Sequence, residues 1–224
     1  MSGAIAVALP PAGLAERPAE LLLVLGALAL VPVALVMLTC FLKMVVVLSI
    51  ARSALGAPQI PPSSAVTGLA LLLTIAVMSP VAEEAWTRAR AVPAGGLERT
   101  LDAATAAGEP LRTFLRRFAR ADDRQAFLEL ARRVRPPRSE VAESDFAVLA
   151  PAFVVSELRR AFTIGFLLFL PFLVVDLVTA NVLLALGLAQ LSPTSVALPF
   201  KLLLFVAADG WRLLARGLVL GYAG

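Results

Sequence analysis

The sequence has 224 residues, of which 59% are hydrophobic, and its 20 basic and 16 acidic residues leave a net charge of only +4. Ordinary soluble domains are about 45–50% apolar, so this composition excludes a typical soluble globular protein, and the small charge excess does not indicate nucleic-acid binding. The chain has one cysteine, Cys40, and no histidine, which excludes a disulfide framework and argues against a metal site or other cofactor.

Two long apolar runs dominate the sequence. Leu21–Ala51 and Ala161–Leu191 each contain 31 residues, with one charged residue apiece. A straight helix of that length would reach about 46 Å, whereas a bilayer core about 30 Å thick takes roughly 20 helical residues. The excess predicts tilt, a bend or an extension beyond the bilayer, and Pro32 and Pro171 are the expected bend points.

The first part of the chain is predicted to be a helical hairpin. Residues 1–20 form an N-terminal segment without the basic region of a secretory signal, so we expect no cleaved signal peptide. The run 21–51 is followed by Ala65–Ala82, which has 18 residues and no charge. Between them, Gly56–Ser64 contains three prolines and is expected to be a non-helical turn. We therefore assign residues 21–82 to a first apolar hairpin.

Residues 83–160 form a polar insert with 12 acidic and 14 basic residues. Apolar residues recur there at i, i+3, i+4 and i+7, which predicts two short amphipathic helices within 111–118 and 126–134. Asp122 and Asp123 precede the second helix and are expected to cap it. The insert is therefore predicted to be a small helical region.

Prolines and glycines predict the boundaries inside this insert. Pro110 and Pro136-Pro137 are expected to limit the two short helices. Val92–Gly108 contains a proline and a Gly-Gly pair and is expected to be a flexible loop. The Arg116-Arg117 pair could be a binding patch, but interleaved acidic and basic residues are more typical of a solvated face.

A second hairpin is predicted after the insert. The run 161–191 is followed by Ser195–Ala208, which has only 14 residues and includes a proline and a lysine, so it is too short to be a secure membrane span. We expect it to be one arm of a buried hairpin, 161–208, with a turn at Ser192-Pro193-Thr194. Residues 209–224 form a C-terminal segment. The predicted fold is all-α and membrane-associated, with two long bent helical hairpins and a small helical polar insert between them.

Ionisable residues inside the apolar blocks are the candidate functional residues. They are Lys43, Asp176 and Lys201. A charge at the bilayer centre costs about 2.5–3.5 kcal/mol, so such side chains usually face the protein interior or a water-filled path. Asp176 and Lys201 could form a proton relay or line a pore, but we favour contacts between helices or subunits. The sequence contains no phosphate-binding loop, nucleophile–base pair or carboxylate cluster, so we expect no catalytic residues and no enzymatic activity.

Three long segments carry recognisable motifs. They are Phe41–Gly56 (FLKMVVVLSIARSALG) with Pro61-Pro62 and Gly68–Leu71; Pro151–Leu158 (PAFVVSEL) with Ile164–Val178; and Leu191–Pro193 with Leu198–Val206 and Asp209–Trp211. These segments include residues from all four apolar blocks and resemble the FliP/SctR family, the export-gate proteins of flagellar and virulence type III secretion systems.

The resemblance implies a role in an assembly. In that family, about five copies form a homo-oligomer that joins FliQ/SctS-like and FliR/SctT-like subunits in a helical, cone-like gate. FlhB/SctU-like and FlhA/SctV-like apparatus proteins are further expected partners. The gate passes unfolded secretion substrates across the bacterial inner membrane without chemistry on them, and nucleic acid is not an expected partner. Much of the assembly lies on the periplasmic side, and the polar insert is extracytoplasmic.

The resemblance also implies a pore constriction. The resemblance implies that a methionine-rich loop, just before the Ser-Pro or Pro-Pro turn in that family, closes around the exported chain with soft side chains. The matching positions here are Leu188, Ala189 and Gln190, none of which is methionine. We therefore expect other groups to form the seal in this chain.

Two alternatives remain beside the favoured assignment. The motif Phe41–Met44, the closing residues Leu218–Tyr222 and the expected lack of a signal peptide favour the virulence branch, SctR/YscR-like, over a flagellar FliP. A flagellar export-gate subunit is the first alternative. A small multi-pass transporter or proton channel is the second, but it should have uniform spans of roughly 20 residues, and the irregular blocks argue against it.

Overall fold

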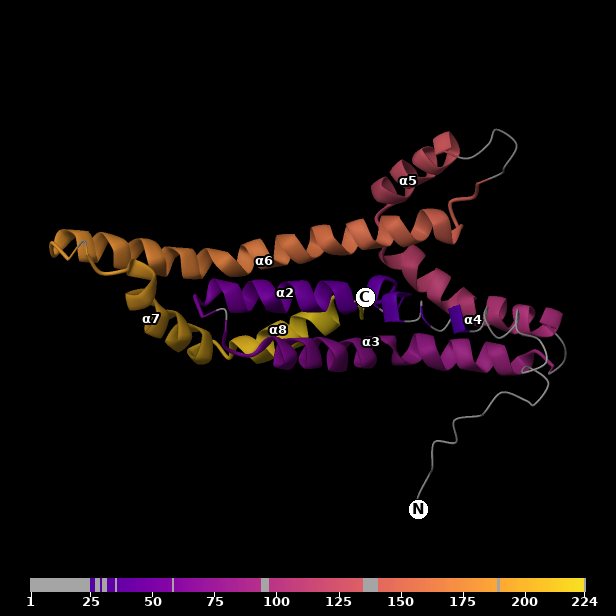
Figure 1. Cartoon of the computed structure of the whole chain (residues 1–224), viewed down its shortest axis with the longest axis horizontal. Helices are drawn as coiled ribbons and strands as arrows, with labels where there is room; N and C mark the ends of the chain where they lie inside the picture. The colour runs from indigo at the N-terminus through magenta and orange to yellow at the C-terminus, as the bar shows by residue number, and fades with distance from the viewer. Residues whose placement is uncertain are drawn as a thin grey trace, which may run out of the picture.

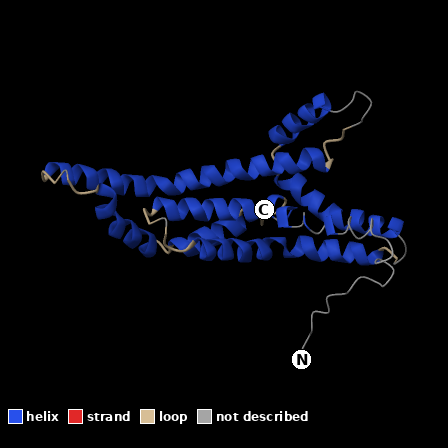
Figure 2. Ribbon diagram, in the orientation of Figure 1, coloured by secondary structure: helices blue, strands red, loops and turns tan. Residues whose placement is uncertain are grey.

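The structure is a computed structural model that describes residues 25, 26, 29, 32–34, 36–57, 59–93, 97–134, 141–188 and 190–223. All regular secondary structure in these ranges is helical (Figure 2), which confirms the predicted all-α class. The labelled helices are α2 (Phe41–Ala54), α3 (Ser63–Ala91), α4 (Leu97–Phe118), α5 (Ala121–Val134), α6 (Phe146–Ala185), α7 (Pro193–Ala207) and α8 (Gly210–Leu220). The predicted N-terminal segment, 1–20, lies outside the described residues.

The helices form an elongated bundle in which α2 lies between α3 and α6 (Figure 1). Helix α4 packs against both α3 and α6, whereas α5 contacts α6 and projects from it on the other side. Helix α7 folds back along α6, and α8 packs against α3 and α7. Helix α2 is therefore the central element of the bundle.

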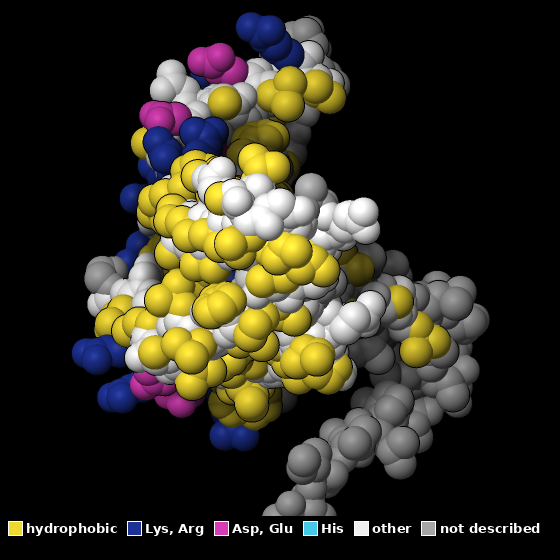
Figure 3. Space-filling view, turned by 90° about the vertical axis from the view of Figure 1, so that its left-hand side faces the viewer, with side chains coloured by type: hydrophobic (Ala, Val, Ile, Leu, Met, Phe, Trp, Pro, Cys, Tyr) yellow, Lys and Arg dark blue, Asp and Glu magenta, His cyan; other side chains and the backbone are white. Residues whose placement is uncertain are grey.

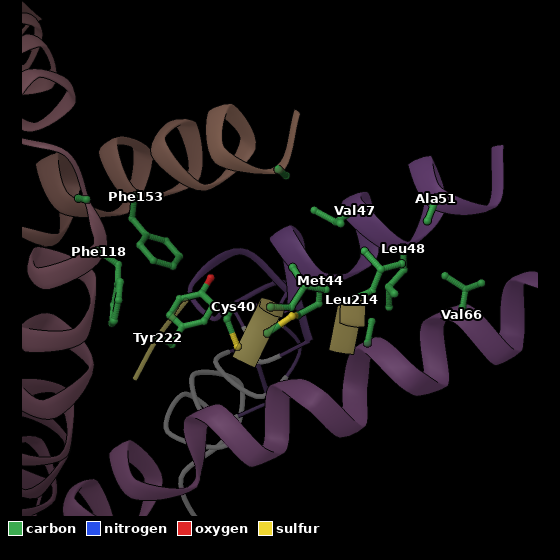
Figure 4. Packing of buried hydrophobic residues seen from close by; sticks show 14 of the residues in the cluster. Cys40, Met44, Val47, Leu48, Ala51, Val66, Phe118, Phe153, Leu214 and Tyr222 are labelled. Carbon is green, nitrogen blue, oxygen red and sulfur yellow. The ribbon is translucent and has the colours of Figure 1, made fainter. Parts of the chain in front are cut away.

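The core is built on one face of α2. Met44, Val47, Leu48 and Ala51 are fully buried, and their i, i+3, i+4, i+7 spacing places them on one side of the helix. Figure 4 shows this row close to Leu214 of α8, which belongs to the same buried cluster. A helix as short as α2, with 14 residues, is marginal alone in water, so packing supplies most of its stability.

The first apolar run is interrupted later than the predicted bend point. Pro32 lies in a described helical stretch, 32–34, and among the described residues the departure from helical geometry falls at Leu38–Cys40, directly before α2 begins. There the hydroxyl of Thr39 accepts a hydrogen bond from the backbone N–H of Phe41 at 3.3 Å. A threonine side chain that bonds the backbone locally competes with helical hydrogen bonding, and this explains the position of the break.

Most of the second apolar run lies in α6, the longest helix among the described residues. Helix α6 has 40 residues with Pro151 and Pro171 inside it, and it would be about 60 Å long if straight. Figure 1 shows it as one gently curved rod, and the helix continues through Pro171. A proline removes one helical hydrogen bond, but apolar surroundings offer the backbone no competing water, so the helix continues.

The insert is more helical than predicted. The expected loop 92–108 is wrong from Leu97 onward, because α4 begins there and runs through Pro110. Four alanines between Ala103 and Ala107 favour the helix. The predicted helices 111–118 and 126–134 are confirmed as parts of α4 and α5. Pro136-Pro137 lies outside the described residues.

Each pair of apolar helices is joined by a turn that starts with a left-handed glycine. Gly56 has φ +79° after α2, and Gly187 has φ +73° after α6; glycine adopts this conformation without the steric cost of a Cβ. The first turn agrees with the prediction except that α3 already begins at Ser63. The predicted turn at Ser192–Thr194 is wrong, because α6 ends at Ala185 and Pro193 is the first residue of α7, a position that proline favours.

A large apolar surface remains uncovered in the single chain. Figure 3 looks onto the end that carries the α6–α7 turn, and hydrophobic side chains cover most of the described surface there. By length and composition alone, α3 and α6 are the two helices in the described ranges that could cross a membrane. The exposed large side chains of α3, α6 and α7 include Leu72, Ile75, Phe166, Leu167, Leu177, Phe200, Leu203 and Val206.

Helices α2 and α6 approach closely at a glycine. A Cβ built on Gly165 would lie 2.4 Å from Cδ1, 2.9 Å from Cγ2 and 3.2 Å from Cβ of Ile50. The first two distances are shorter than real carbon contacts, so a larger residue would have to push the two helices apart or displace Ile50. Glycine at this position therefore sets the spacing of the central helix pair.

We predict that Gly165→Ala lowers the free energy of unfolding by about 1–3 kcal/mol, because it overpacks the α2–α6 contact. Thermal unfolding of the detergent-solubilised chain, followed by circular dichroism, measures the effect. Gly68→Ala is the matched control: it is also helical, has nothing within 4 Å of the added Cβ and should be neutral or slightly stabilising. The double variant Ile50→Ala/Gly165→Ala should recover much of the free energy of unfolding that Gly165→Ala loses. Equal stability of the two Gly→Ala variants would contradict the prediction.

Candidate functional site

A buried ion pair joins α2 to α6. Nζ of Lys43 lies 3.3 Å from Oε2 of Glu157, and the two side chains are 4% and 0% exposed. Arg160, one turn further along α6, donates a hydrogen bond to Oε1 of Glu157 at 2.7 Å. A charge removed from water is costly unless it is paired and hydrogen-bonded, and here both carboxylate oxygens have partners.

Tyr222 completes this group from the C-terminal end of the described chain. Its hydroxyl donates a hydrogen bond to Oε2 of Glu157, and Nζ of Lys43 lies 3.5 Å from the centre of its ring, a cation–π contact. Burial, and then the charge of Glu157, raise the pKa of Tyr222 above its ordinary value, so the phenol keeps its proton and remains a donor. We call Lys43, Glu157, Arg160 and Tyr222 the Glu157 cluster.

A second polar group fixes the start of α5 to α6. The hydroxyl of Ser156 donates to Oδ2 of Asp123 at 2.7 Å and accepts from the backbone N–H of Arg120 at 2.9 Å. Arg159 donates to Oδ1 of Asp123 at 3.0 Å. Asp122 and Asp123 were predicted to cap this helix; both instead lie inside its first turn, and the carboxylate of Asp123 bonds α6.

A third polar group ties α7 to α6 and to the end of α2. Nζ of Lys201 lies 2.6 Å from Oδ2 of Asp176 and donates to the carbonyl oxygen of Ala54, the last residue of α2, at 3.3 Å. A cation is favourable at the negative C-terminal end of a helix. The other carboxylate oxygen of Asp176, Oδ1, is shielded from solvent and has no hydrogen-bond partner among the described residues.

The three charged residues singled out in the sequence belong to two separate groups. The structure pairs Asp176 with Lys201, whereas Lys43 pairs with Glu157. Lys43 is near the start of α2 and Ala54 is its last residue, so the two groups contact the helix at points about 16 Å apart. The chain's two lysines therefore make their polar contacts at opposite ends of the same central helix, α2.

The predicted constriction residues lie in the α6–α7 turn. The side chain of Leu188 is 44% exposed, and Gln190 is also exposed. Ala189 lies outside the described residues. The turn occupies one extreme end of the molecule (Figure 1), where both described side chains are free of the core.

The prediction missed Glu157, although the sequence carries a signal for it. Leu149, Phe153, Glu157 and Ala161 follow one another at intervals of four, and all are fully buried. This spacing places Glu157 on the apolar face of a helix, but dividing the chain at residue 160 assigned it to the polar insert. No comparable local pattern marks Tyr222, which lies beyond the end of α8.

Other ion pairs lie at the surface. Nε of Arg124 on α5 donates to Oε1 of Glu143 at 2.6 Å, and this hydrogen bond lowers the pKa of Glu143 below its ordinary value. Arg88 and Glu84 on α3 are about half exposed and 2.7 Å apart. Exposed pairs contribute at most about 1 kcal/mol each, so the buried groups above are the energetically important ones.

The buried polar residues do not form a metal site. Within the ranges that the structure describes, no three His, Cys, Asp or Glu side chains are grouped so that they could hold an ion. The buried carboxylates of Glu157 and Asp123 are instead neutralised by basic side chains and hydroxyl donors. The arrangement holds the helices together.

A helical chain with long apolar helices, an apolar exterior and internal ion pairs fits the class of membrane-associated helical proteins, and the comparison with known families gives the family. The chain belongs to the FliP family, whose model matches residues 24–218. This confirms the resemblance read from the three sequence segments.

Individual relatives come from both secretion and flagellar systems. The chain is 44% identical to the hypersensitivity response secretion protein HrcR of Ralstonia nicotianae over 91% of this chain and 97% of HrcR. It is 44% identical to the Yop proteins translocation protein R of Yersinia pestis, over 92% and 96% of the two chains. The flagellar biosynthetic protein FliP of Caulobacter vibrioides is 43% identical, over 93% of this chain and 77% of that protein.

We predict that Glu157→Gln lowers the free energy of unfolding by about 3–5 kcal/mol, because it leaves the buried Lys43 without a counter-charge. The double variant Lys43→Met/Glu157→Gln should recover part of this loss, since the unpaired charge is gone. Glu143→Gln, which breaks an exposed pair, is the control and should cost no more than about 1 kcal/mol. Thermal and denaturant unfolding in detergent measure all three. A double variant that is less stable than Glu157→Gln would contradict this account.

Proposed function

We propose that this chain is a core component of the export gate of a type III secretion system. The observation that carries the proposal is its similarity to HrcR and the Yop translocation protein R over more than 90% of the chain. With sister subunits it forms a channel for secreted proteins across the bacterial inner membrane. The chain acts on its substrates by conducting them, without chemistry.

The uncovered apolar surface supports a role inside an assembly. Large exposed side chains on α6 and α7, such as Phe166, Leu177 and Phe200, are unfavourable in water, and only some of them can face lipid if the helices pack with neighbours. A monomeric soluble protein rarely exposes so large an apolar area. We propose that about five copies pack through these faces, together with FliQ/SctS-like and FliR/SctT-like subunits, and that FlhB/SctU-like and FlhA/SctV-like proteins adjoin the assembly.

The two helix pairs support the proposed organisation of the subunit. Helices α2 and α3 form the first hairpin, whose second arm extends beyond residue 82 to Ala91, and α6 with α7 forms the second, whose first arm already begins at Phe146. We propose that the insert, 83–160, faces the periplasm and that much of the assembled gate lies on that side of the inner membrane. Residues 209–224 contribute α8, which packs against α3 and α7.

The candidate residues are proposed to have two different roles: some make contacts between helices or subunits, and others line the path of the exported chain. We propose that Lys43, Asp176 and Lys201 are contact residues; Asp176 retains one buried oxygen without a partner among the described residues, which a donor from a neighbouring subunit can satisfy. Leu188, Ala189 and Gln190 are proposed to line the constriction. The exposure of Leu188 and Gln190 at one end of the molecule supports this assignment.

A flagellar export-gate subunit is the second candidate, and the 43% identity to the Caulobacter FliP favours it. Deleting the gene in its host separates the two. The virulence assignment expects that effector secretion is lost, that motility is retained and that the chain restores secretion when supplied in trans. Loss of motility with intact effector secretion would establish the flagellar role. If the deletion leaves both effector secretion and motility intact, and the purified chain is a monomer that conducts ions, the gate proposal is wrong and the chain is a small channel.

We predict that Asp176→Ala reduces assembly of the gate more than the conductance of each gate that does assemble. The substitution leaves Lys201 buried without its counter-charge, which is costly. Native mass spectrometry of the complex measures assembly, and effector export is then expressed per assembled complex. Glu84→Ala, which breaks an exposed pair, is the control and should change neither quantity. Normal assembly with lost export would instead assign Asp176 to conduction.

A further inference from the structure

The turn after α8 carries one buried aromatic side chain, Tyr222. Helix α8 ends at Leu220, yet the side chain of Tyr222 is buried and reaches elements that α8 itself packs against little. It contacts Glu157 of α6 through its hydroxyl and Lys43 of α2 through its ring. The same ring lies 5.9 Å from Phe114 and 4.7 Å from Phe118 of α4, centre to centre. Tyr222 therefore connects the C-terminus to three helices at once.

Tyr222, which contacts Lys43 and Glu157, also lines an open cleft. The cleft has a volume of about 240 Å³ and is lined by Tyr222 together with residues of α3 and α4, among them Val77, Pro80, Thr113 and Phe118. A cavity of about 150 Å³ is large enough to hold benzene. The aromatic ring therefore has room to leave its position without displacing a helix.

We propose that Tyr222 is a releasable latch. In the closed state it seals the Lys43–Glu157 pair from solvent and holds α2, α4 and α6 as one body. On release, the ring swings into the cleft beside α3 and α4, water reaches the ion pair, and the pair weakens because the local dielectric rises. The contacts through which Tyr222 joins α4 and the end of α8 to α2 and α6 are then lost. The latch is a property of the subunit itself and operates whether or not the proposed export function is correct.

The chain contains a native reporter for this motion. Cys40 is its only cysteine, its side chain is fully buried, and it lies three residues before Lys43. A buried thiol is inert to alkylation, whereas an exposed one reacts. Figure 4 shows Cys40 and Tyr222 close together in the packed cluster. Opening of the latch should therefore expose the thiol of Cys40.

The test measures the alkylation rate of Cys40 in the full chain in isolated membranes. Samples are treated with N-ethylmaleimide for increasing times and denatured, and the remaining thiol is counted by a gel shift with polyethylene-glycol maleimide. Tyr222→Phe keeps the ring but loses one hydrogen bond to a charged group, so we expect about tenfold faster alkylation. Tyr222→Ala also loses the cation–π contact, and about 100-fold faster alkylation is expected.

Two control variants distinguish release of Tyr222 from a general loss of stability. Leu220→Ala changes a side chain that is 55% exposed and should leave the rate unchanged. Gly165→Ala destabilises the opposite part of α2 and should accelerate alkylation less than Tyr222→Phe does. The latch is overturned if Tyr222→Phe alkylates at the unaltered rate, or if Gly165→Ala accelerates alkylation as much. Tyr222→Phe decides the question if Tyr222→Ala fails to fold.

Discussion

A charge buried among apolar side chains must be paired, and this requirement organises the bundle around α2. The chain has only two lysines, and both are buried in ion pairs, Lys43 with Glu157 and Lys201 with Asp176. One pair lies near the start of α2, and Lys201 also bonds the last carbonyl of that helix. Apolar contacts are non-directional, so we interpret the two pairs as the features that fix how α2 sits against α6 and α7.

The remaining architecture follows from packing on this central helix. The buried row from Met44 to Ala51 packs into the hydrophobic cluster on one face of α2, and Gly165 allows α6 to approach closely. What is left outside is a surface of leucine, valine and phenylalanine on α3, α6 and α7. A subunit with its polar groups paired inside and its apolar groups outside is suited to a membrane assembly, which agrees with membership of the FliP family.

Parts of the fold were predictable because they depend on neighbouring residues. The helical spacing of Leu111, Phe114, Leu115 and Phe118 is local, and that helix is present as the end of α4. The helix boundary predicted at Pro110 was wrong, because α4 runs through it, and α6 likewise continues through Pro171, where a bend was expected. Proline is a strong helix breaker when water can satisfy the freed carbonyl, but a helix that packs against others, or lies in apolar surroundings, persists through the missing bond.

The sequence by itself determined the apolar class of the chain, its helical character and its family, because composition, spacing and motifs are properties of the chain order. Only the tertiary structure decided which charges meet. Tyr222 bonds a residue 65 positions away, and Lys201 bonds a carbonyl 147 positions away. Such partners are selected when helices pack and water is excluded from between them, since only then does an unpaired charge become costly enough to choose one arrangement over another.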